Sequence, residues 1–275
     1  MGLPHYIQRV VNEAEENNAN IIIFDIDTFG GRVDAATQIK DIILDSKVTT
    51  IAFINKRAIS AGALIALSCD SIFMTPGASI GAATAVDLQG NKASEKVISY
   101  MREEMASTAE ANNRSRGVAT AMVDEELSID FLLNMQGDTL TAKDVEGFAE
   151  GKLITLSTQL AVQLGIAGGE FERIEDVLKY LELENVEQKN TKESWSEKLV
   201  RFLTNPVVAP LFMSLGMLGL FMEIKSPGFG IPGIVGLTCL ALFFGSHFLV
   251  GLADMTEVIF LLAGIALILM EILVV

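Results

Sequence analysis

Asp27-Thr28-Phe29-Gly30-Gly31-Arg32 is a glycine-rich turn that follows an apolar run in this chain of 275 residues. The run, residues 21–26, is rich in β-branched side chains and predicts a buried strand, and residues 33–44 after the turn have the spacing of an amphipathic helix. Paired glycines between a strand and a helix let backbone N–H groups point outward, where an oxyanion can be held. An ordinary left-handed turn of an α/β domain accounts for the same glycines.

A serine lies near the start of a second stretch, Ile59-Ser60-Ala61-Gly62-Ala63. The sequence around it predicts a strand over residues 49–54, a polar and basic connection over 55–59, and a helix of small residues over 61–67. Ser60 therefore falls at a helix N-terminus, where unpaired N–H groups favour negative charge. A serine that only caps the helix would occupy the same position.

The order of these elements, followed by Met74-Thr75-Pro76-Gly77-Ala78-Ser79-Ile80-Gly81-Ala82, resembles the ClpP/crotonase superfamily, and within it the NfeD-type membrane-bound serine proteases. The resemblance covers about residues 6–185. It resumes at residues 223–236, which are similar to the family's turn into its second membrane span. It implies an α/β fold with a ClpP/crotonase-like repeated β-β-α domain, followed by an α-helical transmembrane region.

The predicted catalytic pair is a serine with a lysine. By the resemblance, Ser60 matches the nucleophile of a serine–lysine dyad, and Lys96, in the helix predicted over residues 93–101, matches its lysine. The chain has only His5 and His247, and neither is well placed for a serine–histidine–aspartate triad. A lysine base needs an ammonium pKa lowered by burial or by positive potential, which the start of a helix supplies.

Other cationic residues compete with Lys96 for this role. Lys92 lies one turn earlier, and Lys56 and Arg57 are nearer to Ser60 in sequence but are interpreted as surface or groove charges. Without the resemblance, Lys96 would be an ordinary solvated helix lysine.

The two glycine-containing stretches also predict the surroundings of the nucleophile. By the resemblance, the backbone N–H groups of Gly31 and Ala61 match the oxyanion hole, and Gly30 and Gly62 are expected to lie beside the bound substrate, because residues without a bulky side chain allow a peptide to approach closely. Phe29 stands where the family usually has proline, a change that leaves the N–H donors in place.

Composition limits the classes of function. The formal charge of −15 argues against nucleic-acid binding, which needs a basic surface. Cys69 and Cys239 lie in different regions and predict no disulfide, and Cys69 is interpreted as a small core residue. The sequence shows no metal-binding cluster, phosphate loop or dinucleotide fingerprint, so we expect no metal and no cofactor.

Three regions are predicted along the chain. Residues 1–185 form the protease domain, and residues 186–203 form a polar linker and an interfacial helix, in which Trp195 and nearby cations suit the lipid headgroups. Residues 204–275 form a transmembrane region of about three helices, with apolar segments at 207–222, 231–252 and 258–275.

The ends of the chain and its orientation are predicted mainly from the resemblance. The family's first core strand, a signal peptide and the C-terminal β-barrel of long members are not found, so we expect a short version or a fragment with an exposed sheet edge. The positive-inside rule places the protease domain in the cytoplasm. The resemblance implies the extracytoplasmic side of a multi-pass cell-membrane protein, and we follow it.

The predicted function is a membrane-anchored serine endopeptidase that cleaves apolar segments of membrane-associated proteins. The resemblance implies stomatin-like partners and a homo-oligomer. The alternative is a catalytically inactive membrane scaffold that keeps the fold and binds such partners.

Overall fold

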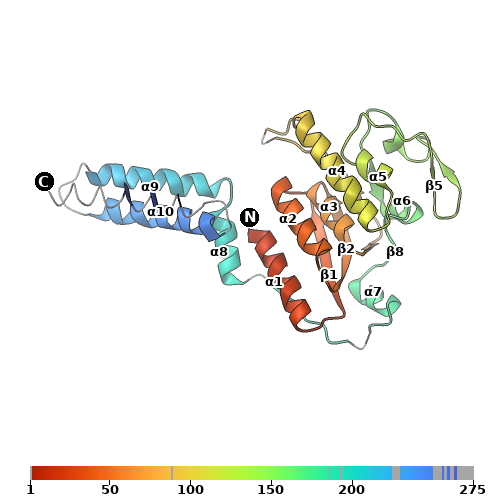
Figure 1. Ribbon diagram of the computed structural model, residues 1–275, viewed down its shortest axis with the longest axis horizontal. Coiled ribbons are helices and arrows are strands. Elements are labelled where there is room, and N and C mark those ends of the chain that lie inside the picture. Colours follow the sequence, from red (N-terminus) through yellow and green to blue (C-terminus); the bar gives the residue numbers. More distant parts are fainter. Residues whose placement is uncertain are drawn as a thin grey trace. The chain divides into compact units, whose positions relative to one another are not determined.

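The computed structural model describes residues 2–87, 89–184, 186–192, 194–224 and 230–249, together with 256, 259–260 and 263–264. The chain divides into two compact units (Figure 1). One unit is residues 7–190, and the other combines residues 1–6 with residues 191–275.

The first unit is built on a mixed sheet whose central strand is β2 (Thr49–Ile59). One edge of β2 pairs with the parallel strand β1 (Ile21–Thr28). The other edge is shared by two further parallel strands, β3 (Ser71–Met74) and then β4 (Ser79–Gly81). The short strands β8 (Gly169–Glu170), parallel to β3, and β7 (Thr155–Ser157), antiparallel to β4, complete the sheet.

The predicted connection over residues 55–59 is wrong, because β2 continues through it. Arg57, Ala58 and Ile59 pair with β4, and Ala58 also pairs with Thr28 of β1 across an irregularity in the register. Hydrogen bonding to two neighbouring strands therefore outweighs the polar character of this segment. β1 is paired only with β2 among the described residues, which agrees with the predicted exposed edge.

Helices surround this sheet. They are α1 (Gly2–Glu16), which begins in the second unit, α2 (Val33–Leu44), α3 (Ala61–Ser68), α4 (Glu95–Ala111), α5 (Arg116–Ala121), α6 (Thr158–Gln163) and α7 (Ile174–Tyr180). α3 packs against β1, β2 and α2, whereas Val177 of α7 packs on a cluster that contains Ile51 and Phe53 of β2. A small hairpin of β5 (Leu132–Leu133) and β6 (Thr139–Leu140) precedes the short 3-10 helix Glu146–Phe148.

Two contacts fix the register between α2 and α4. Lys40 Nζ lies 2.9 Å from Glu104 Oε2, and the hydroxyls of Thr37 and Tyr100 are 3.4 Å apart. Residue numbers rise together along both helices, so the two helices run parallel. Their amino-terminal ends therefore lie at the same side of the sheet.

A buried arginine anchors the end of α3. The guanidinium of Arg114 donates to the carbonyl oxygens of four residues at 2.9–3.1 Å: Leu67, Cys69, Asp70 and Ile166. It thereby satisfies carbonyl groups that a helix end leaves unpaired. Cys69 is fully buried beside it, and burial raises the pKa of its thiol to about 12, which confirms Cys69 as an unreactive core residue.

The second unit contains α8 (Trp195–Leu203), α9 (Val208–Ile224) and α10 (Ile231–Leu249). α9 and α10 pack closely through glycines, since a Cβ placed on Gly219 would lie 2.7 Å from the Cα of Gly236. The carboxylate of Glu223 accepts hydrogen bonds from the backbone N–H groups of Gly230 and Gly233 at the start of α10. The two helices therefore form a hairpin held together by glycine packing and by the hydrogen bonds of Glu223.

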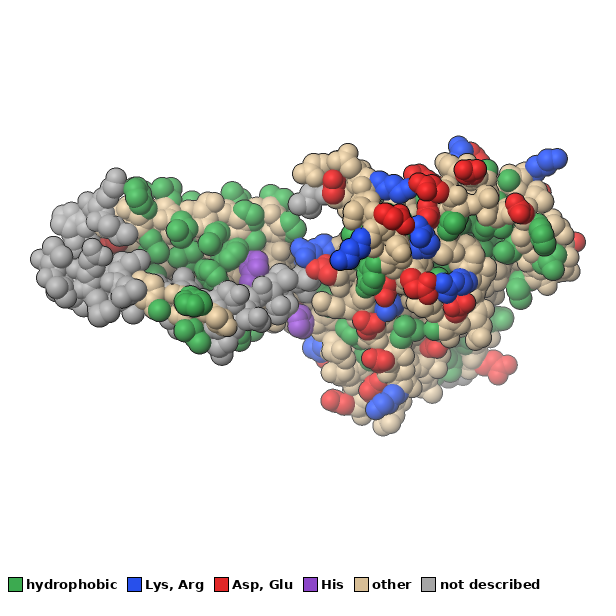
Figure 2. Space-filling view, turned by 45° about the horizontal axis from the view of Figure 1, so that its top comes forward, with side chains coloured by type: hydrophobic (Ala, Val, Ile, Leu, Met, Phe, Trp, Pro, Cys, Tyr) green, Lys and Arg blue, Asp and Glu red, His purple; other side chains and the backbone are tan. Residues whose placement is uncertain are grey.

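Hydrophobic side chains gather on the surface of this hairpin, whereas charged side chains are spread over the first unit (Figure 2). Within the described residues, α10 is one helix long and apolar enough to cross a membrane, and α8 with α9 forms a pair bent by 71° that passes the same test. The predicted segments 207–222 and 231–252 correspond to α9 and α10. The third predicted segment, 258–275, lies almost wholly outside the described residues.

Candidate active site

Ser60 occupies a sharp turn between β2 and α3. Its φ and ψ angles are 56° and −119°, a conformation that residues with a side chain rarely adopt. Its N–H group donates to the carbonyl of Gly81 at 3.0 Å, which ties the turn to the end of β4. The Ser60 side chain makes no hydrogen bond to the first turn of α3, so the capping interpretation of this serine is wrong. Ser60 is half-buried. Strained strand-to-helix turns of this kind carry the nucleophile in many hydrolases.

The two glycine-containing stretches meet at Ser60. Gly30 has a φ of 122°, and its turn is closed by a hydrogen bond from its N–H group to Thr28 Oγ1 at 3.0 Å. A Cβ placed on Gly30 would lie 2.7 Å from the Cβ of Ser60 and 3.2 Å from its Oγ. The backbone of the first turn therefore lies directly against the serine side chain.

Replacing Gly30 by alanine is expected to lower kcat/KM for peptide hydrolysis by about 10²-fold or more, because the new methyl group displaces Ser60 and the backbone must leave its left-handed conformation. Gly117→Ala in α5 is the matched control. A Cβ on Gly117 meets only Ser115 Oγ, at 3.9 Å, and its φ is not positive, so activity should stay near that of the parent. Steady-state kinetics with thermal melting checks this. An active Gly30→Ala variant would separate this turn from the chemistry.

Two backbone N–H groups near Ser60, those of Gly31 and Ala61, donate to no hydrogen-bond acceptor among the described residues. The N–H of Ala61 belongs to the first turn of α3, where the helix offers no partner, and Gly31 is exposed. This pair has the donor chemistry of an oxyanion hole. Gly62 is packed against β1, because a Cβ placed on it would lie 2.5 Å from Thr28 Cγ2. The absence of a side chain at this position therefore allows α3 to approach β1.

Lys96 is the second residue of α4, and its side chain is exposed. It precedes Tyr100 by one helical turn, just as Val33 precedes Thr37 in the neighbouring helix. Lys96 thus lies one turn before a residue that reaches α2, the helix that follows the Gly31 turn. Among the described residues, Lys96 makes no hydrogen bond to Ser60.

Lys92 is engaged elsewhere. Its Nζ lies 3.2 Å from Glu125 and 3.7 Å from Glu126, and the hydrogen bond to Glu125 raises the pKa of Lys92. A lysine held as an ammonium between two carboxylates is poorly suited to accept a proton. Both histidines belong to the second unit, His5 through residues 1–6 and His247 through α10, where its Nδ1 donates to the carbonyl of Phe243.

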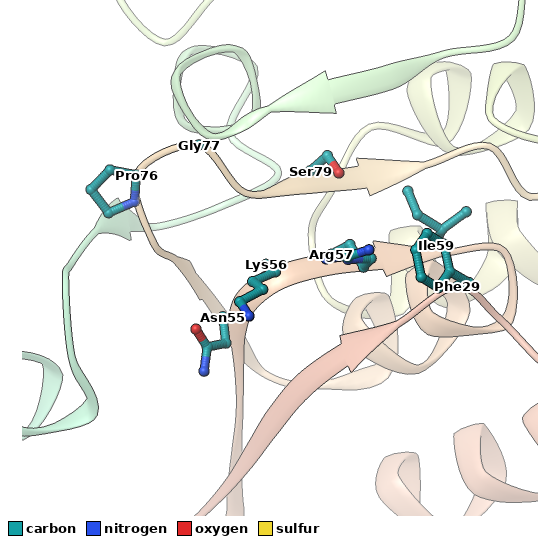
Figure 3. A pocket seen from close by; sticks show the side chains of 8 residues that line it. All are labelled: Phe29, Asn55, Lys56, Arg57, Ile59, Pro76, Gly77 and Ser79. Carbon is teal, nitrogen blue, oxygen red and sulfur yellow. The ribbon is translucent and has the colours of Figure 1, made fainter.

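An open groove of about 450 Å³ runs along the sheet beside the serine turn (Figure 3). Its lining residues come from the ends of β1 and β2 and from the segment that leads into β4: Phe29, Asn55, Lys56, Arg57, Ile59, Pro76, Gly77 and Ser79. Ser60 does not line this groove, but its neighbour in the chain, Ile59, does, and so does Phe29, which precedes Gly30.

Lys56 and Arg57, interpreted from the sequence as surface or groove charges, both line this groove, but the contacts of Arg57 were not predicted. The guanidinium of Arg57 stacks over the ring of Phe29 at 4.3 Å and pairs with Asp27 at 3.0 Å. Phe29 is 76% exposed, so this contact holds an aromatic ring at the mouth of the groove. Among the described residues, no group of three or more His, Cys, Asp or Glu side chains is arranged to hold a metal ion.

Comparison with known families identifies both parts of the chain. Residues 1–191 match the N-terminal domain of NfeD1b, and residues 207–275 match the NfeD integral membrane domain. The chain belongs to the NfeD family. The family resemblance predicted from the two turns is therefore confirmed, and the chain is a membrane protein.

Two curated relatives align with most of the chain. Membrane protein NfeD1b of Bacillus subtilis is 40% identical over 98% of this chain and 59% of its own length. Membrane-bound protease PH1510 of Pyrococcus horikoshii is 29% identical over 85% of this chain and 52% of its own length. The chain thus spans between half and three fifths of the length of these relatives.

A solved structure is similar in fold. It is a lysine-to-alanine mutant of the 1510-N membrane-bound stomatin-specific protease in complex with a substrate peptide. The two chains are 25% identical with a TM-score of 0.58, and the match covers 74% of this chain and 92% of that one. The predicted α/β fold is confirmed by this likeness.

Proposed function

We propose that this chain is a membrane-anchored serine endopeptidase in which Ser60 is the nucleophile, Lys96 is the general base, and the N–H groups of Gly31 and Ala61 hold the oxyanion. The observation that carries the proposal is the strained turn of Ser60, whose side chain is free of the helix cap and lies against Gly30. Such strain persists only where the surrounding structure fixes it, and it is concentrated at functional sites.

The proposed reaction follows from these positions. Ser60 Oγ attacks the substrate carbonyl carbon and gives its proton to the neutral amine of Lys96. The carbonyl oxygen becomes an oxyanion that accepts from the N–H groups of Gly31 and Ala61. The lysine ammonium then protonates the leaving amine as the peptide bond breaks. Water, activated by the same lysine, releases the acyl group from Ser60.

Lys96 is preferred to Lys92 on two grounds. Lys96 lies one helical turn before Tyr100, whose hydroxyl reaches Thr37 in the helix that follows the Gly31 turn, and the two carboxylates hold Lys92 as an ammonium. Hydrogen bonds between catalytic groups are often long in unliganded enzymes and shorten when substrate binds. The exposed position of Lys96 in this structure is therefore compatible with a catalytic role.

We further propose that the substrate is an extended apolar segment of a membrane-associated protein that lies in the groove beside Ser60. Ile59 and the exposed ring of Phe29 supply apolar surface at the end nearest the nucleophile. PH1510 is described as stomatin-specific, which supports a stomatin-like protein as the partner. The α9–α10 hairpin supports a multi-pass membrane anchor. We also propose that the protease domain is extracytoplasmic and that the chain forms a homo-oligomer, as the family resemblance implies.

The alternative is a non-catalytic membrane scaffold. It is favoured by one observation: among the described residues Lys96 makes no hydrogen bond to Ser60 and has an exposed side chain. In this case the groove binds a partner segment without cleaving it.

A fluorophosphonate probe separates the two functions, because it reacts with a serine only when the hydroxyl is activated. We expect the intact chain in membranes to be labelled and Ser60→Ala to lose the label. Ser79→Ala is the matched control, since Ser79 lines the same groove on a regular strand, and it should be labelled like the parent. A folded parent chain that takes up no probe would support the scaffold and overturn the protease.

A further inference from the structure

We propose that α8 is a surface-bound helix that lies in the interface between lipid headgroups and acyl chains, with Trp195 and Phe202 inserted into the bilayer. α8 lies just before the region matched to the integral membrane domain, which begins at residue 207. The inference concerns the second unit alone and is independent of the proposed protease activity.

The exposed face of α8 has the chemistry of an interfacial helix. Trp195 and Phe202 are 77% and 55% exposed, and they lie two turns apart on one stripe of the helix. Lys198 is exposed between them, and Leu203, on another side, is buried. Two solvent-facing aromatic rings flanking a cation are unfavourable in water but suit the headgroup region, where the rings are buried and the long lysine chain reaches the phosphates.

The geometry within the unit sets α8 across the membrane helices. The axis of α8 is bent by 71° from that of α9. A helix at that angle to a membrane-spanning neighbour runs nearly parallel to the bilayer plane. α9 itself is apolar and exposes side chains such as Leu211, Leu215 and Leu218 that lipid would cover. The surface of α8 is thus continuous with a surface that lipid already covers.

Local contacts keep α8 helical before it reaches lipid. Ser194 and Glu197 form a reciprocal capping box at its first turn, with bonds of 3.2 Å and 2.6 Å. The last residues of the predicted linker, from Trp195 on, therefore belong to this helix. The Tyr6 hydroxyl donates to the carbonyl of Thr191 at 2.8 Å, just upstream. Because the helix is preorganised, membrane binding costs less ordering entropy.

A lipid surface fits this face better than a protein partner. Two aromatic rings and one lysine on a helix of nine residues offer far less than the roughly 800 Å² that each side of a stable protein interface buries. The adjoining hairpin is the part of the chain that belongs to the membrane domain. The lipid bilayer is therefore the surface that covers this face of α8.

Trp195 is the only tryptophan in the chain, so intrinsic fluorescence reports on α8 without any label. The full chain would be reconstituted into phosphatidylcholine vesicles made with lipids brominated either near the headgroup or near the chain ends. We expect strong quenching by the shallow bromines, weak quenching by the deep ones, and protection from aqueous iodide. Quenching by iodide without bromolipid quenching would overturn the proposal, and so would stronger quenching by the deep bromines.

Two variants with a relocated tryptophan give the matched controls. Trp195→Phe with Phe202→Trp keeps the probe on the same stripe, so the bromolipid pattern should be unchanged. Trp195→Phe with Ser196→Trp moves the probe off the stripe, and we expect iodide to quench it at least about fivefold more than the parent. Equal protection at positions 195 and 196 would mean a helix buried on all sides, and different depths at 195 and 202 would mean a tilted helix. Either result contradicts an in-plane α8.

Discussion

Ser60→Ala is expected to lower kcat/KM for peptide hydrolysis by about 10⁴-fold or more, because removing a nucleophile leaves only the contribution of binding and the oxyanion hole. The loss should be in chemistry rather than in folding. The methyl of alanine fits the space against Gly30, and the hydroxyl makes no helix-cap bond whose loss would weaken α3. Hydrolysis of an apolar peptide by the full chain in proteoliposomes measures the effect.

Ser79→Ala serves as the control, since it removes a hydroxyl from the same groove without touching the strained turn. It should change kcat/KM little, and both variants should keep the parent's melting temperature and membrane insertion. Activity of Ser60→Ala within about tenfold of the parent would remove Ser60 from the chemistry, because a lost nucleophile costs far more than that.

The fold was predictable where apolar periodicity was clear. Residues 21–26 and 33–44 form β1 and α2 with only small changes at their ends. The second half of β2 was missed because Asn55, Lys56 and Arg57 read as a polar connection. These residues line an open groove, so the sequence shows no buried alternation there, and pairing with β1 and β4 alone defines the strand.

The candidate site was predictable only in part. The stretches at residues 27–32 and 59–63 each follow a predicted strand. Because the carboxyl ends of parallel strands lie at the same edge of a sheet, the sequence indicated that Ser60 and the Gly30 turn would meet. Ser60 has a positive φ, and its N–H group donates to the carbonyl of Gly81, twenty-one residues further along the chain. The stacking of Arg57 on Phe29 and the pairing of Lys92 with Glu125 are likewise long-range contacts. Spacing within one motif carries no information about such contacts.

Lys96→Ala is expected to lower kcat/KM by roughly 10³-fold, within the range that a general base contributes. Lys96→Arg should not restore activity, because a guanidinium keeps its proton at any working pH. Both variants should lose kcat while KM and the melting temperature change little, as expected for a group that acts in the chemical step. A lysine with only a structural role would lower the melting temperature together with the activity, so the two measurements separate the two roles.

Lys92→Ala is the matched control, because it removes a lysine one turn away together with an exposed ion pair that contributes little to stability. Its kcat/KM and melting temperature should stay close to those of the parent. The opposite pattern, an essential Lys92 and a dispensable Lys96, would require Lys92 to leave Glu125 and Glu126 and would make Lys92 the base. Retention of activity in both variants would exclude Lys92 and Lys96 alike as the base.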